Sequence, residues 1–248
     1  MKRLTCLVAA WLASGLGLAA EHSATGAPSD WGGHMMGGQQ FWMVMLDRFE
    51  YGDSDDGDNR LWDAQAWYGG DYNKLYFKTE GEGNTGEALE AAEFQLLYDR
   101  LIAPFWSLQA GVRHDVRPSA ADVSYAAFGV QGLAPQWFET DLAAYVSEDG
   151  DVSLRAEFEY DLLLTQRLVL QPRLEINASL NDVPELGIAS GLGSTEVGLR
   201  LRYEIRREFA PYVGFRWERL YGDSRDFARA EAEPLSKTSF VVGLRAWF

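Results

Sequence analysis

Long stretches of alternating apolar and polar residues constrain this chain more than any other feature. Alternation with a period of two is the pattern of a β-strand that has one apolar face. Every second residue from Val152 to Leu162 is apolar, and the five residues between them are charged or polar. The same pattern recurs over 167–180 and 196–206. The sequence therefore predicts several long strands, each with one apolar face.

The length of these strands indicates a membrane protein. They run to ten residues or more, whereas globular strands average ~5–6 residues and a tilted transmembrane strand needs ~9–11. A soluble β-sandwich would rarely carry so many charges on each strand, but a transmembrane barrel directs them into its lumen. No apolar stretch after residue 20 is long enough for a membrane-spanning helix. We therefore predict an all-β fold, a transmembrane antiparallel up-and-down β-barrel of about 12 strands.

The connections between the predicted strands alternate between short turns and longer loops rich in Asp, Gly and Ser. In bacterial barrels the short turns face the periplasm, so both termini are predicted to be periplasmic. Aromatic residues near strand ends suit the two interfacial girdles of such a barrel; they are Trp42, Trp62, Tyr98, Trp106, Trp137, Tyr145, Trp217 and Phe248. The strands are predicted at 41–50, 60–69, 72–80, 87–100, 105–116, 122–132, 137–148, 151–163, 166–180, 194–207, 211–221 and 238–248.

The first twenty residues have the pattern of an export signal. Met1-Lys2-Arg3 precede an apolar run that ends in small residues, as in a secretory signal peptide. The only cysteine, Cys6, lies inside this segment. We therefore predict a signal peptide at 1–20, a flexible periplasmic N-terminal segment at 21–40 and an outer-membrane β-barrel at 41–248.

The net charge favours cations as partners. Without Lys2 and Arg3, 20 of the 22 basic residues remain against 37 acidic ones. An acidic chain of this kind makes nucleic acid an improbable partner. Its field attracts cations, although acidic outer loops also serve solubility.

The methionines are gathered near the start of the predicted barrel, with His34 beside them. After Met1, every methionine lies between residues 35 and 45. Thioether and imidazole groups together suit Cu(I), and imidazole also binds Cu(II). Unbranched methionines also fill space near a barrel mouth, and the residues alone do not decide between these two interpretations. The candidate metal ligands are His34, Met35, Met36, Met43, Met45 and Asp47, the last three being predicted to face the lumen.

A mixture of acids and bases is predicted to face the lumen, which favours a salt-bridged, partly occluded interior over a wide pore. His114 falls on the lipid-facing side of its strand, so a catalytic role is not expected there and no enzyme is predicted. The principal lumen charges are Asp63, Glu93, Arg113, Glu157, Glu159, Arg173, Glu175, Arg202 and Glu204.

Several segments resemble the copper-resistance protein B (CopB) family of outer-membrane proteins, and together they span nearly the whole predicted barrel. They lie at 62–63, 70–76, 109–113, 129–135, 159–167, 170–175 and 199–212. The resemblance implies an outer-membrane protein of copper resistance and homeostasis that binds copper. It further implies that the protein holds copper or transports it across the membrane beside periplasmic copper-handling proteins. Members often begin with a long His/Met-rich stretch, which is reduced here to His22 and the cluster at 34–36.

The leading hypothesis is therefore a non-catalytic copper-binding barrel, with copper ions, outer-membrane lipid and periplasmic copper-handling proteins as its partners. One alternative is a general or cation-selective porin, or a purely structural barrel. The other is a hydrolase built on a barrel, which would have to use His114 as its base.

Overall fold

The computed structural model describes residues 39–54, 57–84, 89–118, 121–230 and 234–248. The predicted signal peptide and the cluster His34, Met35 and Met36 lie outside the described residues. Among the described residues, no helix is long or apolar enough to cross a membrane. The strands are β1 (Phe41–Ser54), β2 (Asn59–Gly69), β3 (Asn73–Asn84), β4 (Ala91–Ala103), β5 (Trp106–Val116), β6 (Val123–Ala134), β7 (Phe138–Ser147), β8 (Val152–Glu159), β9 (Leu162–Leu163), β10 (Leu168–Ser179), β11 (Gly191–Tyr203), β12 (Phe209–Leu220) and β13 (Ser236–Trp247). Short helices interrupt the connections at η1 (Pro135–Trp137), η2 (Pro184–Leu186) and α1 (Ser224–Ala230).

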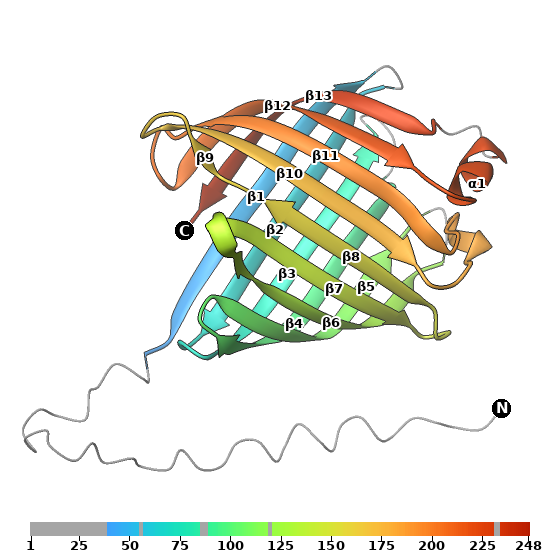
Figure 1. Ribbon diagram of the computed structural model, residues 1–248, viewed down its shortest axis with the longest axis horizontal. Helices are drawn as coiled ribbons and strands as arrows, with labels where there is room; N and C mark the ends of the chain where they lie inside the picture. Colours follow the sequence, from blue (N-terminus) through green and yellow to red (C-terminus); the bar gives the residue numbers. More distant parts are fainter. Residues whose placement is uncertain (1–38, 55–56, 85–88, 119–120, 231–233) are drawn as a thin grey trace, which may run out of the picture. The chain divides into compact units, whose positions relative to one another are not determined.

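The strands form one antiparallel sheet that closes on itself (Figure 1). Consecutive strands pair from β1 to β8, the sheet continues through β10, β11, β12 and β13, and β13 pairs with β1. The two-residue strand β9 pairs with the same edge of β10 as β8 does. Because β8 and β9 share one position, the barrel has twelve positions. The prediction of an all-β barrel with about twelve strands is confirmed.

A proline on the neighbouring strand accounts for the break between β8 and β9. Arg173 pairs with Glu159 and Leu170 pairs with Leu162, so Pro172 of β10 stands beside Tyr160 in the gap. Its carbonyl accepts a hydrogen bond from the Tyr160 N–H at 3.2 Å. Proline has no N–H to return, so the ladder is interrupted there.

The distribution of side chains is the reverse of that in a soluble domain. Arg48 and Arg200 are among the largest fully buried side chains, whereas Trp42 is 65% exposed and Trp137 is 68% exposed. Charged residues are almost never fully buried in soluble proteins unless they are paired. A barrel with lipid outside and a filled lumen inside produces this arrangement.

The two ends of the barrel differ. The short turns lie at one end, called here the short-turn end, and α1 and η2 lie at the other, called the long-loop end (Figure 1). The first and last strands also meet at the short-turn end, where Val44 and Phe248 exchange two backbone hydrogen bonds of 3.0 and 2.9 Å. The side of the membrane that each end faces stays a prediction.

A β-bulge in β1 reverses the inside–outside alternation. The pairing of β1 with β2 shifts register between Leu46 and Arg48, and its pairing with β13 is irregular in the same region. Asp47 therefore lines the lumen together with its neighbour Arg48, which is 2% exposed. A β-bulge adds one residue to a strand in this way.

One predicted girdle residue is on the wrong side. Tyr145 was expected at the membrane interface, but it is 3% exposed and lies inside the barrel. The guanidinium carbon of Arg113 is 4.4 Å from the centre of its ring, and that of Arg155 is 5.8 Å away. These arginines hold the ring in the lumen because an aromatic face attracts a cation.

Gly111 provides a test of how closely the strands approach. A Cβ atom at Gly111 would lie 2.0 Å from the carbonyl oxygen of Leu96, whereas one at Gly193 would have its nearest neighbour at 3.5 Å. We expect Gly111→Ala to destabilise the refolded barrel by about 2 kcal/mol because backbone atoms must shift. Gly193→Ala should leave it unchanged. Urea unfolding, followed by heat-modifiable migration in gels, measures both, and equal midpoints would contradict the prediction.

Candidate functional site

Rows of carboxylates line the lumen at adjacent positions on neighbouring strands. Asp63 pairs with Glu80 and Glu80 with Glu93 across β2, β3 and β4. On the other side of the barrel, three more acids stand in register across β8, β10 and β11, namely Glu157, Glu175 and Glu196. Like charges directly opposite one another destabilise a sheet. These rows therefore require cationic side chains between them.

Arg48 neutralises acids from three strands. Its guanidinium lies 3.0 Å from the Asp63 carboxylate, 2.6 Å from that of Glu80 and 3.6 Å from that of Glu196. Its side chain is 2% exposed. A buried charge requires such partners because desolvation would otherwise cost several kcal/mol.

Arg173 has the same role beside the second row. Its guanidinium lies 2.8 Å from Glu157, 3.0 Å from Glu159, 2.8 Å from Glu175 and 3.0 Å from Glu196. Since Glu196 contacts both Arg173 and Arg48, the two groups form one continuous network. We call it the ion-pair layer.

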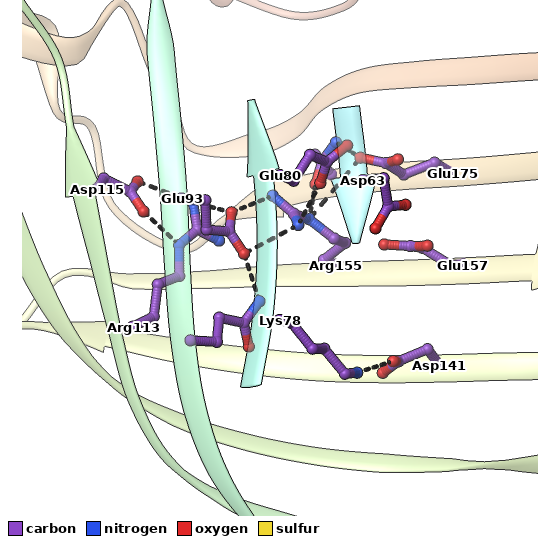
Figure 2. Close-up of polar contacts among 12 residues, drawn as sticks. Asp63, Lys78, Glu80, Glu93, Arg113, Asp115, Asp141, Arg155, Glu157 and Glu175 are labelled. Atoms are coloured by element: carbon purple, nitrogen blue, oxygen red, sulfur yellow. Dashed lines mark hydrogen bonds and ion pairs between the residues drawn. The ribbon is translucent and has the colours of Figure 1, made fainter. Parts of the chain in front are cut away.

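Other ion pairs cross the lumen between strands that are not neighbours. Figure 2 shows Arg155 of β8 reaching Glu80 of β3 and Glu93 of β4. Lys78 of β3 likewise meets Asp141 of β7 at 2.6 Å. These contacts tie distant walls of the barrel together and narrow the lumen.

A cavity of about 480 Å³ remains on the short-turn side of the ion-pair layer, and we call it the chamber. Nine carboxylates and four basic side chains line it, so its wall is acidic. The carboxylates are Asp47, Asp63, Glu80, Glu93, Asp99, Glu139, Asp141, Glu157 and Glu159, and the bases are Lys74, Lys78, Arg155 and Arg245. An acidic cleft with low-dielectric walls concentrates cations.

Two of the predicted metal ligands lie on the chamber wall. Met45 and Asp47 both line it, and Arg245 of β13 lies beside them. The Arg245 guanidinium is 3.6 Å from the Met45 sulfur and 2.9 Å from the Asp47 carboxylate. Met43 stands opposite Trp67 of β2 and does not line the chamber.

The predicted lumen charges lie at three levels of the barrel. The chamber wall includes Asp63, Glu93, Glu157 and Glu159. Nearer the short-turn end, Arg202 contacts Glu204 at 3.9 Å and Asp161 at 2.6 Å. The other predicted lumen charges form ion pairs farther from the short-turn end; they are Arg113, Arg173 and Glu175.

The outer face carries the one histidine among the described residues. His114 is exposed, and its Nδ1 lies 3.0 Å from the hydroxyl of Ser124. Within the described ranges, no three His, Cys, Asp or Glu side chains form a group that could hold a metal ion.

Sequence reasoning left four central residues out of the predicted lumen set, namely Arg48, Glu50, Glu80 and Glu82. Arg48 and Glu50 follow the bulge in β1, so a strict period of two assigns them to the lipid face. Glu80 and Glu82 share the parity of Lys74 on β3. The alternation itself could have found these last two.

The ion-pair layer predicts a large difference between buried and exposed arginines. Arg173→Ala leaves four carboxylates without their shared cation, and we expect it to lower the free energy of unfolding by about 3–5 kcal/mol. Arg207→Ala is the matched control, because Arg207 is 66% exposed and pairs with Glu204 at the surface; its effect should be below about 1 kcal/mol. Urea titration of both refolded variants measures the difference, and similar losses would refute the role given to Arg173.

Comparison with known proteins agrees with this architecture. Residues 40–248 match the family model described as copper resistance protein B precursor (CopB). Copper resistance protein B of Escherichia coli is 47% identical over 207 residues, covering 84% of this chain and 69% of that protein. A copper resistance protein B homolog of Pseudomonas syringae pv. tomato is 43% identical over 204 residues, covering 82% and 69%.

A solved barrel supports the fold. The structure of the NanC porin aligns with a TM-score of 0.53 at 11% identity, over 82% of this chain and 98% of the porin. That likeness concerns the fold alone, and with the family match it confirms the predicted location in the outer membrane. The chain belongs to the copper resistance protein B family of outer-membrane proteins.

Proposed function

We propose that this protein binds copper in the chamber at the short-turn end of its barrel. The protein then either sequesters the copper or passes it across the outer membrane, and it catalyses no reaction. The observation that supports the proposal best is the position of Met45 and Asp47 on the wall of the acidic chamber. A thioether is a ligand that Cu(I) prefers, and a carboxylate suits harder ions. The acidic wall would raise the local concentration of either oxidation state.

Arg245 makes this site responsive to a cation. Its guanidinium already contacts Met45 and Asp47, and a third contact reaches the Asp161 carboxylate at 3.9 Å. A copper ion bound to Met45 and Asp47 repels the guanidinium. Arg245 then has Asp161 as an alternative partner within reach, so its buried charge stays neutralised.

The remaining predicted ligands have supporting roles in this proposal. Met43 lies two residues before Met45 on the same face of β1 and is therefore nearer the short-turn end. We assign it to contact the ion before the ion enters the chamber. His34, Met35 and Met36 precede β1 in the sequence, and we assign them the initial capture of the ion. Imidazole and thioether groups suit that step because, taken together, they bind Cu(I) and Cu(II).

The orientation of the barrel determines the source of the copper. Short turns face the periplasm in bacterial outer-membrane barrels, so we propose that both chain ends and the chamber face the periplasm. The chamber would then receive copper from that compartment. Periplasmic copper-handling proteins are the corresponding partners.

The alternatives have less support. A general porin needs an open lumen, whereas ion pairs cross this one. A barrel hydrolase would use His114 with Ser124, but no described residue orients the imidazole ring through its other nitrogen. Phospholipid or peptide hydrolysis that disappears in His114→Ala would revive the hydrolase. A cation-selective porin is compatible with the acidic chamber and is tested by conductance below.

Substitutions on the chamber wall test the copper site. Met45→Leu keeps the shape of the side chain but removes the thioether, and Asp47→Asn removes the carboxylate. We expect each to weaken copper binding by roughly tenfold, because each removes one ligand of the ion. Competition with a chromophoric Cu(I) chelator, under anaerobic conditions and with refolded protein, measures the change.

The matched control is Gln65→Ala, because Gln65 lies directly opposite Met45 on β2 and lines the same chamber. It should bind copper as the unmodified protein does. Unchanged stoichiometry and affinity in both Met45→Leu and Asp47→Asn would reject the site. In cells that lack the protein, the same variants should restore less copper tolerance than Gln65→Ala does.

A further inference from the structure

The chamber is closed at its inner end. Passing from the short-turn end towards the long-loop end, its wall finishes at the same level on three strands, with Glu80 on β3, Glu93 on β4 and Arg155 on β8. The next inward-facing residues on these strands do not line it; they are Glu82, Ala91 and Ser153. In the described part of the barrel, the chamber therefore ends at the level of Arg155.

Arg155 crosses the lumen at this level. Its guanidinium lies 3.0 Å from the Glu93 carboxylate and 3.4 Å from that of Glu80. In the closed sheet, β5, β6 and β7 separate β8 from β4 on the nearer side. The side chain therefore spans the cavity between distant walls, as Figure 2 shows.

Arg155 is held less tightly than the neighbouring arginines of the lumen. Its closest ion-pair distance is 3.0 Å and its side chain is 16% exposed. Arg48 and Arg173 are at most 2% exposed and have ion pairs of 2.6 and 2.8 Å. Arg216, further towards the long-loop end, is 3% exposed and pairs with Glu82 at 2.5 Å.

Arg155 also has partners on its own side of the lumen. Its Nε lies 3.8 Å from the Glu175 carboxylate and 3.3 Å from the side-chain oxygen of Asn177, both on the adjacent strand β10. A change of rotamer can withdraw the guanidinium from Glu80 and Glu93 while these contacts keep its charge paired. The ion pairs across the lumen can thus be broken while the buried charge of Arg155 keeps a partner.

We propose that Arg155 is the gate that closes the inner end of the chamber and controls the passage of cations through the barrel. A cation in the chamber competes with Arg155 for Glu80 and Glu93. When the guanidinium withdraws to Glu175 and Asn177, Glu80 and Glu93 each lose one cation and keep Arg48 and Arg113 as partners, so the wall towards Glu82 becomes more acidic. The role in copper passage rests on the proposed function, whereas the gate itself does not.

Conductance in a planar bilayer tests the gate with potassium chloride alone. We expect the unmodified protein to conduct weakly and Arg155→Ala to raise the single-channel conductance roughly tenfold with a preference for potassium over chloride, since the substitution removes the side chain that crosses the lumen and leaves its wall more acidic. The reversal potential under a salt gradient measures that preference. Equal conductance of the two proteins would overturn the proposal.

Lys78→Ala is the matched control. Lys78 also crosses the lumen to an acid, Asp141, but the pair lies within the chamber and not at its inner end. Its removal should leave the barrel closed. A rise in Lys78→Ala as large as that in Arg155→Ala would show that any lost ion pair opens the barrel, and it would reject Arg155 as the gate.

Arg155→Lys keeps the experiment decisive if Arg155→Ala fails to fold. A lysine keeps the charge but lacks the planar fork that reaches two carboxylates at once, so its conductance should lie between those of the unmodified protein and Arg155→Ala. A folded Arg155→Lys variant as closed as the unmodified protein would contradict the gate. Heat-modifiable migration confirms folding in each case, and because no copper is present, failure of the copper site would not affect these results.

Discussion

The closure of the sheet is the constraint on which the rest of this structure depends. In the hydrocarbon of a membrane each backbone N–H and C=O must find a partner within the protein, and a closed barrel satisfies this condition. Here β13 pairs with β1, and β10 pairs with both β8 and β11, so the ring of strands is closed. Once the ring is closed, every second side chain must face the lumen. The number of strands then fixes how much space those side chains share.

Charge pairing in this limited space explains why the lumen is divided. Twelve strand positions bring the inward side chains of distant strands within contact, as the pair between Lys78 and Asp141 shows. Arg48 and Arg173 are so deeply buried that each contacts several carboxylates, and Glu196 serves both of them. The result is an ion-pair layer with a chamber on one side only. A barrel with fewer inward charges would be more open.

The sequence predicted the strands well because alternation depends only on neighbouring residues. The stretch from Val152 to Leu162 has the predicted faces, and its single interruption comes from Pro172 on another strand. Such a break cannot be predicted until the register of the two strands is known. Tyr145 was misplaced for a different reason: it shares the parity of Glu139 and Asp141, which line the chamber, so the alternation along β7 already directs it inward.

For the candidate site, the sequence likewise predicted which side chains of β1 face the lumen, but not which residues they contact there. The parity of β1 assigned Met45 and Asp47 to the lumen, where the structure has them on the chamber wall. Their neighbour Arg245 could not be anticipated, because it is 200 residues away from Met45 in the sequence. Which acids share an arginine depends likewise on register and on contacts across the lumen. Composition and alternation carry neither kind of information.

The bulge in β1 connects the mouth of the chamber with the ion-pair layer. In a regular strand, Asp47 and Arg48 would face opposite sides of the sheet. The extra residue turns both inward, so that Asp47 lies beside Met45 and Arg245 while Arg48 binds Asp63 and Glu80. A single peptide bond therefore joins a residue of the chamber wall to a residue of the ion-pair layer. Bulges often redirect a side chain next to a functional site, and this one places the proposed copper ligand and the first arginine of the layer at consecutive positions.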